Sequence, residues 1–177
     1  MLLTANRAVL MLVDLQERLM PAIYGGGDVV AAADRLARAA GLLEVPVVAT
    51  EQYPKGLGHT VPALAGYPGA VLAKTAFSAV AEPGFDTLLP PERDEIVVVG
   101  AEAHVCVLQT VLELCARDHR VVLVADAVGS RAPADRDHAL ARAREHGAEV
   151  VSSEMVLFEW LRDSTHPLFR DVQALLR

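Results

Sequence analysis

Short apolar runs alternate along the chain with longer segments in which apolar residues recur at every third or fourth position. The short runs are rich in Val, Leu and Ala, and none of them alternates cleanly between apolar and polar residues. This pattern is typical of parallel strands in a sheet that helices cover on both faces. We therefore predict buried strands at residues 8–13, 45–50, 70–74, 95–100, 120–126 and 148–153.

Helical spacing between these runs predicts what covers the sheet. Segment 133–146 has Pro133 near its start and Gly147 just past its end, the usual asymmetry of a helix. Alternating strands and helices predict an α/β fold: a three-layer α/β/α sandwich around a Rossmann-like, doubly wound sheet of about six mostly parallel strands. The predicted helices are 28–43, 103–118, 133–146 and 167–176, with shorter ones near 84–89 and 155–162.

Length and charge limit the organisation and the partners of the chain. Its 177 residues suit a single domain over 1–177, in which residues 51–69 form an ordered functional loop. The net charge of −7, with no basic block, argues against binding to nucleic acid or to a membrane surface. We find neither an apolar stretch of membrane-spanning length nor a signal-peptide cleavage pattern, and we expect a cytoplasmic protein.

The two cysteines, Cys106 and Cys115, show neither a zinc-ligand spacing nor a CxxC pair. They fall on different turns of one predicted helix, so we expect no disulfide between them. Free cysteines are consistent with a reducing compartment.

Three residues with catalytic potential follow predicted strands. Asp14 ends the first strand, Lys74 ends the third, and Cys106 comes shortly after the fourth. Each has an ordinary explanation alone, as a turn residue, a solvated strand end or a packing cysteine. In doubly wound folds, however, ligands bind at the carboxyl ends of the strands, where all three would meet. A helix N-terminus and a lysine would favour the thiolate there, and a carboxylate would accept its proton.

Competing catalytic motifs are absent from the sequence. The turn after the first strand lacks G-x-G-x-x-G, and the chain has no G-x-x-x-x-G-K-[ST] phosphate loop and no G-x-S-x-G elbow. No arginine lies between Val107 and Cys115, where a cysteine phosphatase would need one. These absences argue against a nicotinamide dehydrogenase, a P-loop nucleotidase, a serine hydrolase and a phosphatase.

The chain carries the segments LMLVDLQERLMP, TEQYPKGLG, KTAFS and GAEAHVCVLQT, and further along DAVGSR and SSEMVLFEWL. In this combination it resembles the isochorismatase-like cysteine hydrolases, which include nicotinamidases and N-carbamoylsarcosine amidohydrolases. Its nearest look-alikes are the isochorismatase-domain-containing proteins. The resemblance spans nearly the whole chain and implies a hydrolase that acts on a small molecule and forms a homo-oligomer.

The resemblance also implies roles for individual residues. The catalytic triad of the family falls on Asp14, Lys74 and Cys106, with Asp14 taking the thiol proton and Cys106 forming a thioester. The oxyanion hole falls on the backbone N–H groups of Glu102 and Cys106, next to a cis peptide bond at Ala101–Glu102. The implied reaction is hydrolysis of a small amide or related C–N bond.

The sequence departs from some members of the family. Metal-dependent nicotinamidases carry an Asp-x-His pattern and further histidines after the second strand, where this chain has only His59. We therefore expect no metal and no other cofactor. True isochorismatases cleave a vinyl ether and commonly replace the cysteine, so Cys106 favours acyl chemistry. Vinyl-ether hydrolysis and a non-catalytic binding or scaffold role stay open as alternatives.

Gln52, Phe77 and His104 flank the strands that carry the triad and are candidates for the substrate pocket. His104 has a second interpretation as a structural hydrogen-bonding residue. Thr110 should pack or bond back to its own helix. Asp126 and Arg131 are expected to form a pair that stabilises a loop.

Overall fold

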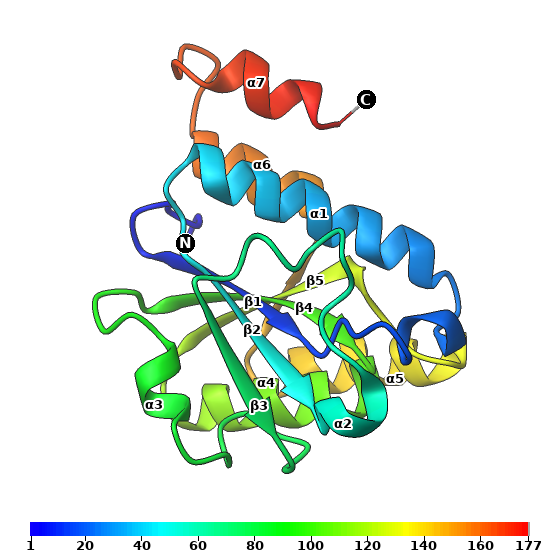
Figure 1. Ribbon diagram of the computed structural model, residues 1–177. Helices are drawn as coiled ribbons and strands as arrows, with labels where there is room; N and C mark the ends of the chain where they lie inside the picture. The colour runs from blue at the N-terminus through cyan, green and yellow to red at the C-terminus, as the bar shows by residue number, and fades with distance from the viewer. Residues whose placement is uncertain (177) are drawn as a thin grey trace.

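Six parallel strands form one sheet in the computed structural model, which describes residues 1–176 (Figure 1). Their order across the sheet is β3-β2-β1-β4-β5-β6, and every neighbouring pair is parallel. The predicted α/β fold is therefore confirmed. The strands are β1 (Ala8–Val13), β2 (Val47–Gln52), β3 (Ala70–Lys74), β4 (Glu95–Ala101), β5 (Arg120–Gly129) and β6 (Glu149–Val151).

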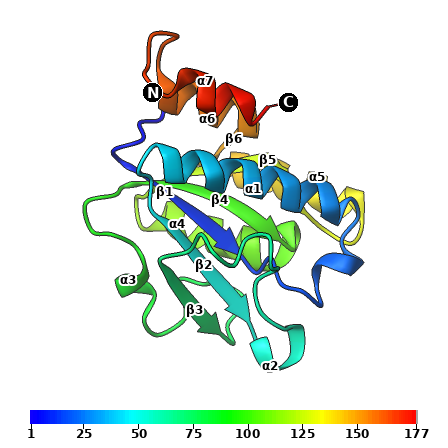
Figure 2. The same ribbon diagram turned by 45° about the horizontal axis from the view of Figure 1, so that its top comes forward.

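The helices lie on both faces of this sheet, as Figures 1 and 2 show. Helices α1, α6 and α7 cover one face, and α3, α4 and α5 cover the other. The helices are α1 (Gly26–Leu42), α2 (Pro54–Leu57), α3 (Phe85–Leu88), α4 (Leu108–Ala116), α5 (Pro133–Glu145), α6 (Ser153–Leu161) and α7 (Phe169–Ala174). A 3₁₀ turn (Met20–Ala22) and a π-helical turn (Ala103–Val107) complete the regular structure.

Strand β1 shows why the sequences of the central strands are unbroken apolar runs. Leu10 and Leu12 pack on the side of α1 and α6, whereas Val9 and Met11 pack on the side of α4 and α5. All four side chains are buried. A strand with helices on both faces has no solvent side, so the alternation of polar and apolar residues disappears.

The prediction that every strand is buried on both faces was wrong at the edge of the sheet. Strand β3 is an edge strand, and three of its five residues are exposed, with Val71 at 52%. Only Lys74, at its carboxyl end, is fully enclosed. The apolar composition of residues 70–74 could not reveal this, because exposure depends on the position of the strand in the sheet.

Two further segments differ from their predicted form. The helix predicted at 103–118 divides into the π-helical turn and α4, and such turns are frequent at functional sites. The loop predicted at 51–69 contains α2, and one backbone bridge from Gln16 to Thr60 ties it to the segment after β1. Both segments lie near the carboxyl ends of the central strands.

Gly100 sets how closely β1 and β4 approach each other near these ends. It pairs with Val13 and has a φ of +145°, a conformation that side chains rarely adopt. A Cβ atom on Gly100 would lie 2.1 Å from the carbonyl oxygen of Val13. Any side chain at this position would force the two strand ends apart.

We predict that Gly100→Ala lowers the free energy of unfolding by about 3 kcal/mol, because the new methyl group overlaps backbone that cannot move aside. Gly41→Ala is the matched control: this glycine is exposed in α1, and its added Cβ meets nothing within 4 Å. The control should gain roughly 0.5 kcal/mol from helix propensity. Urea unfolding of both variants measures the difference, and equal stabilities would contradict this account of Gly100.

Candidate active site

The strand order brings the candidate residues together at one point of the sheet. From β1 the chain continues to β2 on one side, whereas β4 continues to β5 on the other, so a crevice opens at the ends of β1 and β4. Asp14 directly follows β1, and Cys106 lies in the π-helical turn after β4. Lys74 ends β3, two strands from β1, and its long side chain spans the end of β2 to reach the same point.

A buried ion pair joins two of these residues. Lys74 Nζ lies 2.8 Å from Asp14 Oδ2, and neither side chain is exposed. The hydroxyl of Thr50 donates to Asp14 Oδ1 at 2.7 Å, while Oδ2 has no donor in hydrogen-bond geometry. Asp14 therefore has one oxygen that is held in place and one that can accept a proton.

The ammonium group of Lys74 has all of its donors in use. It donates to the side-chain oxygen of Gln52 at 2.6 Å and to the carbonyl oxygens of Ala76 and Phe77 at 3.2 and 2.9 Å. A lysine has three N–H donors, and these three acceptors match that number. Lys74 is thus fixed as a positive charge beside Asp14.

The thiol of Cys106 is protonated at neutral pH. Burial, and after it the negative charge of Asp14, raise its pKa to about 12, while the positive charge of Lys74 opposes the shift. The positive charge of Lys74 favours the thiolate, as expected, but desolvation in this enclosed position outweighs it. The thiol needs a base when it reacts, and Asp14 is the carboxylate next to it.

Gln52 lies inside this arrangement rather than at the rim of a pocket. Its side-chain oxygen accepts from Lys74 and lies 4.0 Å from the sulfur of Cys106, while its Nε2 donates to the Thr75 carbonyl at 2.8 Å. The buried side chain of Gln16 holds the Gln52 backbone, accepting its N–H at 2.8 Å and donating to its carbonyl at 3.0 Å. Gln16 also donates to the Gly58 carbonyl at 2.7 Å, so it ties the loop after β2 to the same point.

A cavity of about 130 Å³ opens beside the thiol. The polar part of its lining consists of Asp14, Gln52, Glu102 and Cys106. The apolar side chains that line it are Leu19, Leu57, Phe77 and Val105. Of the candidate pocket residues, Gln52 and Phe77 line this cavity. His104 does not: its Nδ1 lies 2.9 Å from the hydroxyl of Ser130 and its Nε2 lies 3.8 Å from Asp135. The structural interpretation of His104 fits this position.

The Ala101–Glu102 peptide bond is cis, and the backbone N–H of Glu102 has no hydrogen-bond acceptor among the described residues. The Glu102 carboxylate accepts the backbone N–H and the Nε of Arg131, each at 3.0 Å. The pair predicted between Asp126 and Arg131 was therefore wrong. Asp126 instead accepts the backbone N–H and the hydroxyl of Ser153 at the start of α6.

The loop after β2 is anchored by a buried carboxylate. Burial pushes the pKa of Glu51 up, but hydrogen bonds from the backbone and hydroxyl of Thr60 and from His59 outweigh it and lower that pKa. The His59 side chain is largely exposed. Within residues 1–176, no three His, Cys, Asp or Glu side chains cluster closely enough to hold a metal ion.

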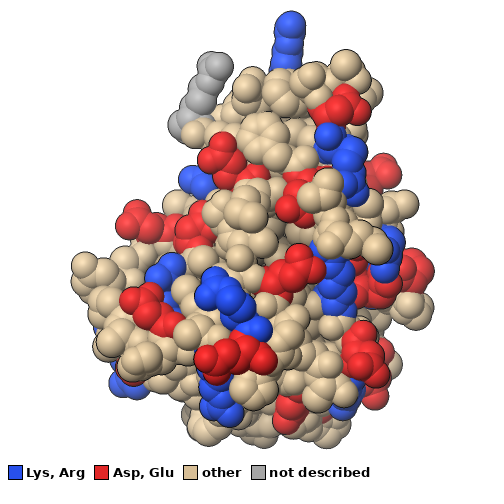
Figure 3. Space-filling view, turned by 180° about the vertical axis from the view of Figure 1, so that it is seen from behind, with Lys and Arg blue, Asp and Glu red and all other residues tan. Residues whose placement is uncertain are grey.

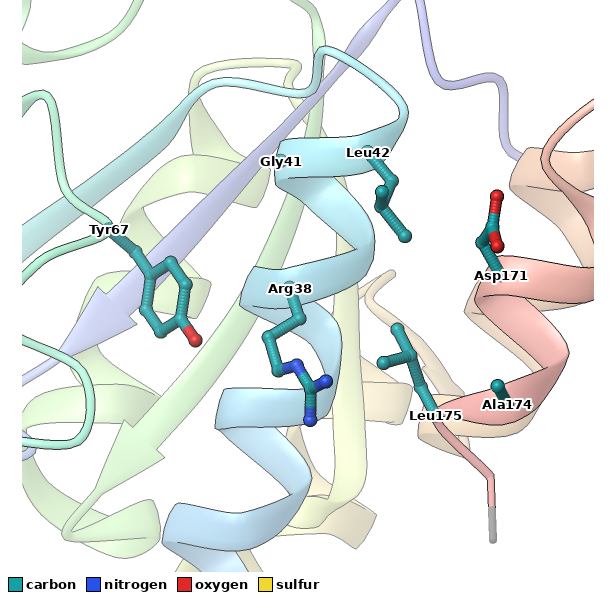
Figure 4. Close-up of a pocket in the computed structure, with 7 residues that line it drawn as sticks. All are labelled: Arg38, Gly41, Leu42, Tyr67, Asp171, Ala174 and Leu175. Atoms are coloured by element: carbon teal, nitrogen blue, oxygen red, sulfur yellow. The ribbon is translucent and has the colours of Figure 1, made fainter.

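A second cavity, of about 500 Å³, lies between α1, α7 and the loop that carries Tyr67 (Figure 4). It is larger than the cavity at Cys106, but the charged side chains that line it are Arg38 and Asp171, with no nucleophile beside them. Cavity size alone therefore does not locate the chemistry of this chain.

Sequence reasoning missed several residues of the site, notably Gln16, Thr50 and the apolar walls of the cavity. Gln16 gave one signal, since it is a polar side chain three residues after the end of the predicted strand 8–13. Thr50 lies within the predicted strand 45–50 and resembled any β-branched strand residue. Thr110 behaves as predicted, because its hydroxyl donates to the Cys106 carbonyl at 2.7 Å.

Comparison with known proteins places the chain among proteins of similar sequence and fold. The isochorismatase domain family matches residues 8–155. The chain is 41% identical over 170 residues to isochorismatase domain-containing protein 2 of Homo sapiens, covering 96% of this chain and 83% of that protein.

Two solved structures illustrate the similarity in fold. A Caenorhabditis elegans protein described as MAR1 ribonuclease superposes with a TM-score of 0.93 at 38% identity, covering 99% of this chain and 92% of that one. The YcaC gene product of Escherichia coli, described as an octameric hydrolase of unknown specificity, shares the fold at 23% identity, with a TM-score of 0.81 and coverage of 99% and 94%.

The electrostatics of the site predict an unusual response to Asp14→Asn. Removing the carboxylate removes a charge that raises the pKa of Cys106, while Lys74 is left with the thiolate as its counter-ion. Alkylation of Cys106 by iodoacetamide at pH 8 should therefore become about tenfold faster, the effect of one pKa unit. Peptide mass spectrometry can follow Cys106 and Cys115 separately. The rate at Cys115 should not change, and a slower rate at Cys106 would contradict this assignment of charges.

Proposed function

The chain belongs to the isochorismatase family, whose fold is that of hydrolases, and we propose that it hydrolyses a small amide or related C–N bond through a thioester on Cys106. One observation carries this proposal: a buried Asp14–Lys74 ion pair lies beside a protonated thiol at the wall of a small cavity. A carboxylate, a fixed cation and a nucleophile are the groups that acyl transfer requires.

The first half of the reaction forms the thioester. As the sulfur of Cys106 attacks the amide carbon, its proton passes to the free oxygen of Asp14, and a C–S bond forms. Lys74 pairs with the Asp14 carboxylate before this step and stabilises the thiolate character that develops during it. Asp14 then gives the proton to the amine nitrogen, the C–N bond breaks, and ammonia or an amine leaves.

The second half restores the enzyme. The oxygen of a water molecule attacks the thioester carbon while Asp14 takes one of the water protons. The C–S bond then breaks, Asp14 passes this proton to the leaving sulfur, and the carboxylic acid product, the Cys106 thiol and the Asp14 carboxylate result. Both halves pass through an oxyanion, for which we propose the backbone N–H groups of Glu102 and Cys106 as donors. The unpaired N–H of Glu102 beside the cavity supports this assignment.

The name of the C. elegans relative raises ribonuclease activity as a competing function. This chain has a net charge of −7, and on the face shown in Figure 3 acidic and basic side chains are interspersed rather than gathered into a basic patch. A polyanionic substrate gains little attraction from such a surface. We therefore place amide hydrolysis first and let RNA cleavage be decided by experiment.

Ammonia release from a panel of primary amides and N-carbamoyl compounds tests the proposal. Cys106→Ala should lower turnover by roughly a thousandfold or more, because the covalent path is lost. Cys115→Ala is the matched control, because this thiol lies in α4 outside the cavity, and it should retain the wild-type rate. Mass spectrometry of a rapidly quenched reaction should detect an acyl group on Cys106.

Three results would contradict the proposal. The first is absence of ammonia release from every compound, which would favour a scaffold role. The second is cleavage of an RNA oligonucleotide that survives Cys106→Ala. The third is turnover of isochorismate without turnover of any amide.

We also propose that the chain forms a homo-oligomer in the cytoplasm, as the sequence led us to expect. The octamer described for the E. coli neighbour is a property of that protein. No helix within residues 1–176 combines the length and the apolar character that crossing a bilayer requires. Light scattering of the purified chain should give a mass that is a multiple of 18.9 kDa, and a mass of one chain at micromolar concentration would contradict self-association.

A further inference from the structure

We propose that the site selects a neutral, short aliphatic acyl group, so that its substrates are amides of acids with about two to four carbons. This inference rests on the proposed hydrolysis at Cys106 and adds the chemical class of the substrate. Three features of the cavity carry it: apolar walls, the absence of a free cation, and a small volume.

The walls are apolar on the side away from the triad. Leu19 comes from the segment after β1, Leu57 from α2, Phe77 from the loop after β3 and Val105 from the π-helical turn. These four side chains come from separate segments of the chain and together form the apolar part of the lining. Contact with such walls favours hydrocarbon groups.

No Lys or Arg side chain among residues 1–176 lines the cavity. Lys74 donates to three oxygens and pairs with Asp14, so a substrate carboxylate could reach it only by displacing those partners. The guanidinium group of Arg131 contacts the lining residue Glu102, but it is bound to the carboxylate of that residue. Neither Lys74 nor Arg131 lines the cavity.

Both acidic residues of the cavity are already paired, so the lining offers no unpaired charge to a charged substrate. A substrate carboxylate would lose its hydration on entering the cavity without gaining a cation among the lining residues, and burying an unpaired charge is costly. A cationic acyl group gains little, because Lys74 already neutralises Asp14 and Arg131 already neutralises Glu102. A neutral acyl group is the one that this distribution of charge accepts.

The cavity volume limits the length of the acyl group. A volume of about 130 Å³ corresponds to about four water-sized groups, each occupying about 30 Å³. After the reacting carbonyl is placed beside Cys106, room remains for a chain of up to about three further carbons. Phe77 is 55% exposed and stands at the open side, where the leaving amine can depart.

A chain-length and charge series of amides tests the inference. From acetamide to butyramide, kcat/KM should rise about fourfold per methylene group, and it should fall by tenfold or more at hexanamide. Succinamate, which is butyramide with a carboxylate in place of its terminal methyl group, should be roughly a hundredfold poorer than butyramide. The kcat/KM for glycinamide, which is cationic, should not exceed the kcat/KM for propionamide.

Leu57→Ala should move the optimum toward longer chains, because it removes three carbons from the wall. Leu42→Ala is the matched control: this leucine lies on α1 at the second cavity, and its removal should leave the profile unchanged. Ratios of kcat/KM for two substrates on one preparation do not depend on the fraction of folded protein. A loss of stability therefore cannot imitate the shift.

Protection of Cys106 from iodoacetamide, measured with the same compounds, separates this inference from the proposed hydrolysis. Protection by butyramide but not by succinamate, without turnover, would support the inference and overturn the hydrolysis. Turnover of succinamate within tenfold of butyramide would overturn the inference and leave the hydrolysis standing. Neither protection nor turnover by any neutral amide would overturn both.

Discussion

The buried ion pair between Asp14 and Lys74 is the interaction on which the rest of the site depends. Moving a carboxylate and an ammonium group out of water costs several kcal/mol for each, and their attraction offsets this only with good geometry and further hydrogen bonds. The hydroxyl of Thr50 donates one hydrogen bond to Asp14, and three carbonyl oxygens accept hydrogen bonds from the ammonium group of Lys74. The carboxyl ends of β1, β2 and β3 must therefore stay in register for both charges to be tolerated.

This pair also explains why a cysteine that is protonated at rest is suited to catalysis. A thiolate in the same enclosed position would lie beside the charge of Asp14, and burial alone disfavours it. In the proposed reaction the proton stays on sulfur until a substrate arrives, and Asp14 Oδ2, which pairs with Lys74, is the oxygen that accepts it. Proton transfer and attack on the carbonyl would then occur together. Lys74 lies close to both groups that can carry the negative charge, Asp14 and the sulfur of Cys106.

Much of the fold could be predicted from the sequence, since runs such as 8–13 and 95–100 are apolar on both faces for a physical reason. Asp14 and Lys74 could be found because each stands where an apolar run stops, and Cys106 because it follows shortly after another such run. The exposure of Val71 could not be predicted, because it depends on the place of β3 in the sheet. The roles of Gln16 and Arg131 depend on contacts between segments far apart in the chain, which no local pattern records.

The proposed hydrolysis assigns catalysis and selectivity to different parts of this molecule. The charged groups lie at strand ends and are matched to one another before any substrate binds, so they cannot change without leaving a buried charge unpaired. The walls of the cavity come from loops and short turns, where Leu19 and Leu57 are only partly buried and bear no charge. Substitution of a wall residue alters the shape of the cavity at small cost to stability. In the proposed hydrolysis, the same ion pair and thiol could therefore serve different amides, and the side chains of the loops would determine which acyl group reaches the sulfur.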